Sequence, residues 1–171
     1  MAGLDDLYRE VILDHYRNPR NRGELPPPAV RIEGFNPLCG DQVILSLEVT
    51  DGVVSNLKLS GHGCSISQSS ASMMSQAVKG NTVERARELI HAFKAMMSIH
   101  EKRLDDLDGG GDIEPGRHLG DLEALQGVVK FPVRIKCATL SWNTLQEGLD
   151  TAAATTHSPT ETKSVGETAQ R

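Results

Sequence analysis

Cys39 and Asp41 place a thiol and a carboxylate one residue apart, and this pair is the clearest chemical feature of the sequence. The proline and the glycine that flank Cys39 indicate a turn that is both rigid and accessible. A soft sulfur donor beside a hard oxygen donor suits a divalent metal of borderline softness, of which zinc is the natural candidate. The other cysteines are Cys64 and Cys137, so three thiols and one carboxylate would complete a set of four ligands.

The three cysteines lie far apart in the sequence and form no CxxC pair. An odd number of widely spaced cysteines does not fit a disulfide framework, so we expect reduced thiols that serve metal binding or chemistry. Each cysteine taken singly is also typical of a small buried core residue. Their positions beside Gly, Pro or Lys at the ends of expected elements favour ligands, which the fold would have to bring together.

The chain has 171 residues and a net charge of −5, with no run of basic residues. This length is sufficient for one domain with a substantial core, which we assign to residues 1–150. The acidic balance argues against nucleic acid or an anionic membrane as a partner. No segment has the length of a membrane helix, and the acidic N-terminus does not resemble a secretory signal. We therefore expect a cytoplasmic protein.

Two strands joined by a tight turn are predicted to place Cys39 and Cys64 together. Residues 42–50 alternate apolar and polar side chains, Asp51-Gly52 is typical of a two-residue hairpin turn, and a return strand follows from Val53 to about Ser60. A further short strand is expected at 30–35. Because antiparallel neighbours bring the start of one strand beside the end of the next, Cys39 and Cys64 should share one edge of the sheet.

Helical patterns account for most of the remaining chain, which indicates an α+β fold. Helices are expected at 3–17, at 65–79, from a capping box at 81–84 onward and, in short form, at 119–128. Cys64 would stand at the N-terminus of the second helix, where the helix dipole favours a thiolate. Residues 131–137 are expected to be extended, and Cys137 would then begin the final helix.

Two segments are expected to lie outside the packed fold. Residues 105–117 are acidic and rich in glycine, which is typical of a flexible surface insertion, and they lack the spacing of an EF-hand calcium loop. Residues 151–171 show no periodicity and are expected to form a disordered tail.

Other constellations of chemical side chains give weaker signals. Of the six histidines, His62 is nearest to a cysteine in sequence, but a surface histidine at a strand end is the simpler interpretation. No Ser/His/Asp order, glycine-rich phosphate loop or dinucleotide fingerprint is present, so hydrolases and nucleotide-dependent enzymes lack support.

Four segments in the same order resemble the U-type iron–sulfur assembly proteins, and specifically their SufU-type branch. They are residues 7–19 (LYREVILDHYRNP), 36–41 (NPLCGD), 61–70 (GHGCSISQSS) and 134–142 (RIKCATLSW). The resemblance covers about residues 4–150. It implies a small three-stranded antiparallel sheet with helices packed on one face, which agrees with the pattern of the elements.

The resemblance also implies a site and a partner. It places Cys39, Asp41, Cys64 and Cys137 on one Zn²⁺, and it makes Cys39 the catalytic thiolate that accepts persulfide sulfur. The sulfur would come from a pyridoxal-phosphate-dependent cysteine desulfurase of the SufS type, with Arg134 at the contact between the two proteins. Downstream iron–sulfur scaffold machinery would then receive it. The implied activity is that of a zinc-dependent sulfurtransferase in iron–sulfur cluster biogenesis.

Two alternatives remain open at this point. In the first, the chain is a non-enzymatic scaffold on which a [2Fe–2S] cluster is assembled with the same ligands. The scaffold branch of the family carries a histidine before its third cysteine, whereas this sequence has Lys136 there. In the second, zinc is purely structural and the chain only binds the desulfurase.

Overall fold

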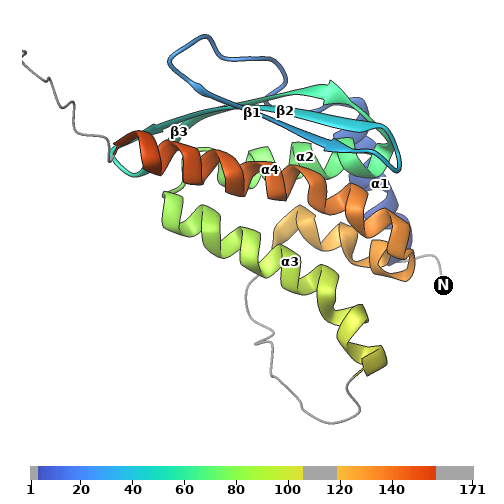
Figure 1. The fold of residues 1–171 in the computed structure, drawn as a ribbon. Helices are drawn as coiled ribbons and strands as arrows, with labels where there is room; N and C mark the ends of the chain where they lie inside the picture. Colours follow the sequence, from blue (N-terminus) through green and yellow to red (C-terminus); the bar gives the residue numbers. More distant parts are fainter. Residues whose placement is uncertain (1–3, 106–118, 157–171) are drawn as a thin grey trace, which may run out of the picture.

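The computed structural model describes residues 4–105 and 119–156 (Figure 1). Two layers make up the fold, a three-stranded sheet and a set of helices on one of its faces. In chain order the elements are α1 (Leu4–Arg17), β1 (Val30–Asn36), β2 (Asp41–Thr50), β3 (Val53–His62), α2 (Ser65–Val78), α3 (Val83–Asp105), the 3₁₀ helix η1 (Gly120–Lys130) and α4 (Pro132–Thr156). The expected α+β class and the packing of helices on one face are confirmed.

The sheet is antiparallel with the order β1-β2-β3. Asn36 pairs with Asp41 at the β1–β2 turn, and Gln42 pairs with His62 at the same end of the sheet. At the opposite end, Asp51 and Gly52 have φ angles of 52° and 74°, as the expected two-residue hairpin turn requires. The register therefore brings the turn that contains Cys39 beside the end of β3, as predicted.

The core lies between the sheet and the helices. Apolar side chains of β2 and β3 point toward α2 and α4, which pack against the sheet, while α3 covers the far side of this helical layer (Figure 1). Trp142 of α4 is fully buried, and its ring stacks on Phe93 of α3 with 4.5 Å between the centroids. The indole Nε1 donates a hydrogen bond to Ser70 Oγ of α2 at 3.1 Å. These contacts join α2, α3 and α4 behind the sheet.

The structure corrects three expectations in the C-terminal third of the chain. Residues 131–137 were expected to be extended, but α4 begins at Pro132, so Cys137 lies in the second turn of the helix instead of beginning it. The short helix expected at 119–128 is a 3₁₀ helix from Gly120 to Lys130. Helix α4 continues to Thr156, so residues 151–156 are not part of a tail. Of the insertion expected at 105–117, Asp105 is the last residue of α3, and residues 106–117, like 157–171, lie outside the described residues.

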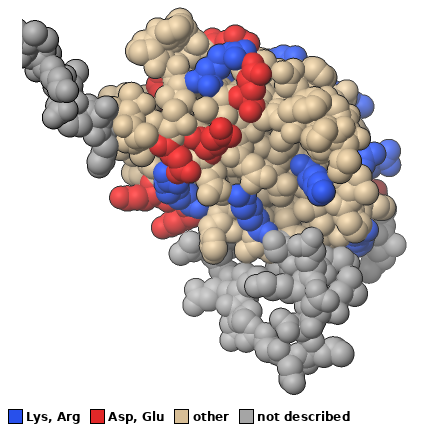
Figure 2. Space-filling model, in the orientation of Figure 1, with Lys and Arg blue, Asp and Glu red and all other residues tan. Residues whose placement is uncertain are grey.

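Figure 2 shows acidic and basic side chains interspersed over much of one face, without a continuous basic area. Among the described helices, none combines the length and the apolar character needed to cross a membrane.

Candidate metal centre

The turn between β1 and β2 holds Cys39 through Asn36. The Gly40 N–H donates to the Asn36 carbonyl at 2.8 Å, and the Asn36 side-chain oxygen accepts from the Leu38 N–H at 3.1 Å. The amide nitrogen of the same side chain donates to Cys39 Sγ at 3.5 Å. Asn36 is buried while Cys39 is exposed. A buried side chain therefore positions a thiol that solvent and a partner can reach.

Asp41 connects the start of β2 to the start of α2. It is 1% exposed, and its Oδ1 accepts the backbone N–H of Cys64 at 2.9 Å. The Cys64 sulfur lies 3.7 Å from Asp41 Oδ2 and accepts a hydrogen bond from the Ser67 N–H in the first turn of α2. Cys64 is thus the N-cap of α2, as predicted.

Gly63 makes the approach of Asp41 to α2 possible. A Cβ atom at this position would lie 2.7 Å from Asp41 Oδ1 and would also meet the Ser67 hydroxyl. Real Cβ atoms do not tolerate such contacts, so any larger residue would displace the carboxylate or the serine. The glycine before Cys64 is therefore required by the geometry of the centre.

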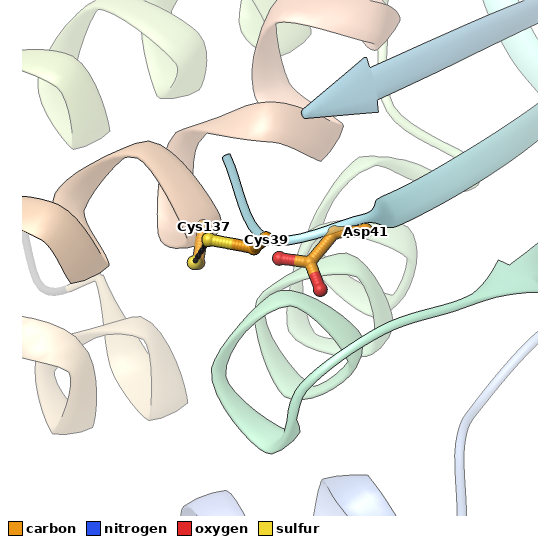
Figure 3. A group of neighbouring side chains, drawn as sticks. All are labelled: Cys39, Asp41 and Cys137. Atoms are coloured by element: carbon orange, nitrogen blue, oxygen red, sulfur yellow. Dashed lines mark hydrogen bonds between the residues drawn. The ribbon is translucent and has the colours of Figure 1, made fainter. Parts of the chain in front are cut away.

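Cys137 enters the centre from the buried side. It is 1% exposed, and its sulfur lies 3.3 Å from Cys39 Sγ. The ligand atoms of Cys39, Asp41 and Cys137 all lie within 4.8 Å of one another. In Figure 3 the two sulfurs face each other, and the Asp41 carboxyl group lies beside them. Helix α4, the β1–β2 turn and β2 converge at this point.

Burial raises the pKa of the Cys137 thiol far above its usual range, and hydrogen bonding with Cys39 and Asp41 raises it further. The charge of a neighbouring Cys64 thiolate would also oppose the ionisation of Cys137. A cation among them would reverse this balance, because metal-bound thiols are deprotonated. The donor set therefore fits a positively charged centre.

Zinc fits the residues that are present. A tetrahedral zinc with Zn–S bonds of about 2.3 Å separates two thiolate sulfurs by about 3.8 Å, which is close to the 3.3 Å between Cys39 and Cys137. Sulfur donors also argue against magnesium and calcium, which prefer oxygen. An iron–sulfur cluster would accept the same thiolates, so the donor set alone admits both.

Three of the four predicted ligands lie in one group, and the fourth lies beside it. Cys39, Asp41 and Cys137 form one group, while Cys64 contacts Asp41 but is not part of the group whose ligand atoms all lie within 4.8 Å of each other. Arg134 is exposed in the first turn of α4, one turn before Cys137. No histidine among the described residues joins the group. His15, for example, is buried elsewhere and contacts Ser72 Oγ at 2.8 Å.

Asn36 is the residue of the centre that our sequence reasoning missed. We used it only as part of a motif, whereas the structure gives it two side-chain hydrogen bonds that shape the Cys39 turn. An asparagine directly before a proline at a turn is a signal for such bonds, because its short amide side chain reaches the backbone two residues later.

Comparison with curated proteins identifies close relatives. The chain is 47% identical over 148 residues to the zinc-dependent sulfurtransferase SufU of Bacillus subtilis, covering 86% of this chain and 92% of that protein. It is 35% identical over 158 residues to the iron–sulfur cluster assembly scaffold protein IscU of Streptococcus pyogenes, covering 92% and 91% of the two chains.

A solved structure and a family model also match this chain. A crystal structure from Fervidobacterium islandicum, described as an iron–sulfur cluster assembly scaffold protein for the SUF system, superposes with a TM-score of 0.67 at 28% identity. The match covers 86% of this chain and 99% of that one. The model of the NifU-like N terminal domain matches residues 7–138, which include all four candidate ligands. This chain therefore belongs to the family of NifU-like N-terminal domains.

Proposed function

We propose that this protein is a zinc-dependent sulfur acceptor in iron–sulfur cluster biogenesis. It takes persulfide sulfur from a cysteine desulfurase onto the Cys39 thiolate. The observation that carries the proposal is the pairing of an exposed sulfur with a buried one at 3.3 Å. The 47% identity to a protein named a zinc-dependent sulfurtransferase supports it.

We assign Cys39, Asp41, Cys64 and Cys137 as the zinc ligands. Bound zinc keeps these thiols deprotonated at neutral pH. Cys137 and Asp41 are each 1% exposed, so they hold the buried side of the centre. Cys39 is exposed and lies on a turn. It is therefore the thiolate that a partner's persulfide can approach without displacing a core element.

The transfer step conserves atoms and electrons. The Cys39 thiolate attacks the terminal sulfur of the persulfide on the desulfurase cysteine. A new S–S bond forms at Cys39, the S–S bond of the partner breaks, and its electron pair returns to the partner cysteine as a thiolate. No oxidant is required. The product is a persulfide on Cys39, ready for the downstream assembly machinery.

The partner in this proposal is a pyridoxal-phosphate-dependent cysteine desulfurase of the SufS type, and Arg134 contributes to the contact with it. Arg134 is exposed on α4, one helical turn before Cys137. Its guanidinium is therefore available to a partner that approaches the metal centre. The mechanism requires reduced thiols, which places the protein in a reducing compartment such as the cytoplasm.

A scaffold for a [2Fe–2S] cluster is the second candidate, because several relatives are named IscU scaffold proteins and the same thiolates could hold iron. Lys136 stands directly before Cys137, where it offers no lone pair to a metal while charged. Protein purified without oxygen separates the candidates. Stoichiometric zinc without a visible absorption band supports the sulfurtransferase, and a stable brown cluster supports the scaffold.

Trapping of the transferred sulfur tests the proposal directly. The protein is incubated with a cysteine desulfurase and cysteine, and the added sulfur is located by mass spectrometry. We expect a gain of one sulfur atom on Cys39, and Cys39→Ala should abolish both this gain and the stimulation of desulfurase turnover. The relay role of Cys39 is wrong if Cys39→Ala stimulates turnover as well as the unaltered protein does.

A further inference from the structure

A groove with a volume of about 680 Å³ lies between α1, the start of α2, the end of η1 and the first turn of α4. Apolar side chains line it, namely Ile12 of α1, Ile66 of α2, Val128 of η1 and Phe131, which lies between η1 and α4. Phe131 is 62% exposed, which is unusual for a large aromatic side chain in a monomeric protein. The groove thus offers apolar surface that the described parts of the chain leave uncovered.

Within residues 4–105 and 119–156, every charged residue that lines this groove is a cation. They are Arg9 of α1, Lys130 at the end of η1 and Arg134 of α4. Among the described residues these three form no ion pair, whereas Arg20, Arg31, Arg85 and Arg87 each pair with a carboxylate. Three uncompensated cations around an apolar groove are unexpected in a chain with a net charge of −5. This arrangement is complementary to an acidic ligand with apolar side chains.

The groove borders the candidate metal centre. Ser65 lines the groove and directly follows Cys64, and Arg134 lines it one helical turn before Cys137. A protein segment seated in the groove would therefore lie next to the thiols. The groove also extends away from them along α1, so it can bind a partner without covering Cys39.

We propose that this groove receives an acidic, apolar segment of the cysteine desulfurase and anchors the complex in which sulfur is transferred. The inference rests on the proposed function and adds to it the chemistry of the partner's docking segment and two further contact residues, Arg9 and Lys130. Carboxylates of the segment pair with Arg9, Lys130 and Arg134. Its apolar side chains pack on Ile12 and Phe131.

A matched pair of double variants tests the charges. Arg9→Glu/Lys130→Glu reverses two groove cations, and Arg17→Glu/Lys79→Glu makes the same residue changes on α1 and beyond the C-terminal end of α2, outside the groove. All four side chains are exposed. Binding of the desulfurase is measured by titration calorimetry, with zinc content and circular dichroism as checks on folding. We expect Kd to rise at least ~10-fold for the groove variant, and less than twofold for the control.

Equal changes in the two double variants would overturn the inference, because only the net charge would then matter. Performing the titration in the Cys39→Ala background separates the two proposals. If the groove variant also weakens binding in this background, the docking site is supported even if Cys39 does not carry sulfur. Conversely, the groove variant could bind the desulfurase as tightly as the unaltered protein while Cys39 still receives sulfur. That result would contradict the docking site and leave the proposed function in place.

Photo-crosslinking identifies the occupant. With p-benzoylphenylalanine in place of Phe131, irradiation of the complex should link the groove to a desulfurase peptide rich in Asp and Glu. A crosslink to a basic peptide of the desulfurase, or to a second copy of this chain, would contradict the assignment.

Discussion

The two sides of the candidate centre differ in how they are held. Cys39 lies on an exposed turn fixed by hydrogen bonds from one asparagine, whereas Cys137 is 1% exposed on a helix that packs against the sheet, α2, α3 and η1. Their sulfurs are nevertheless 3.3 Å apart. One centre therefore combines a ligand that can move at small cost with one that cannot move without disturbing the core.

This contrast between the two thiols suits a centre that must both bind metal and react. A thiolate bonded to zinc is a weak nucleophile, so one ligand has to become free when sulfur is transferred. Displacing Cys39 disturbs a short turn, while displacing Cys137 would disturb α4 and the layer behind it. The difference in packing supports the proposed roles, in which Cys39 is the reactive ligand and Cys137 the retained one.

The largest test of this contrast is Trp142→Ala on the buried side. The change removes the stacking on Phe93 and the hydrogen bond to Ser70, and leaves a cavity behind α4. We expect the free energy of unfolding to fall by about 3–5 kcal/mol, measured by urea denaturation. Zinc should be lost in parallel, because α4 positions Cys137.

Leu7→Ala on α1 is the control for this change, since Leu7 is 58% exposed. It should alter the free energy of unfolding by no more than about 0.5 kcal/mol. If Trp142→Ala proves equally mild, α4 is not the rigid side of the centre.

Gly63→Ala should have an intermediate effect, at the contact between the two sides. The added methyl group collides with the Asp41 carboxylate and the Ser67 hydroxyl. We expect zinc affinity to fall by about 10–100-fold, as when a group that supports a metal ligand is disturbed. Competition with a chelator measures this affinity.

Gly127→Ala is the matched control, because a Cβ at Gly127 would meet nothing within 4 Å. Its zinc affinity should equal that of the unaltered protein. Unchanged affinity in Gly63→Ala as well would show that the position of Asp41 is not critical.

Asn36→Ala should have the smallest effect on stability, and its effect should be confined to the exposed side. The turn loses two side-chain hydrogen bonds, to the Leu38 N–H and to Cys39 Sγ. We expect unfolding to become easier by about 1 kcal/mol. Sulfur transfer to Cys39 should slow although zinc is retained. A loss of zinc as complete as that expected for Trp142→Ala would mean that the turn is as essential to the centre as the helix.

Local chemistry explains what the sequence could predict. The Asp51-Gly52 turn, the alternation in β2 and the capping position of Cys64 depend on neighbours in the chain, so their patterns are readable. The shared edge of Cys39 and Cys64 followed from the hairpin alone. These features located one side of the centre without tertiary information.

The start of α4 shows why the rest could not be predicted. Val133 and Ile135 favour a strand, and we took Pro132 as part of an extended segment, whereas proline is also well suited to the first turn of a helix. Packing against β1, β2 and α2 decides the outcome. The placement of Cys137 beside Cys39 depends on that packing, and only the family resemblance indicated it.

The hydrogen bond from the Cys64 N–H to Asp41 has one further consequence. Because a backbone amide of the protein itself holds the carboxylate, the fold orients Asp41 and ties the start of β2 to the start of α2. We therefore expect this contact to persist when zinc is removed, so that the apoprotein can take up the metal again without refolding.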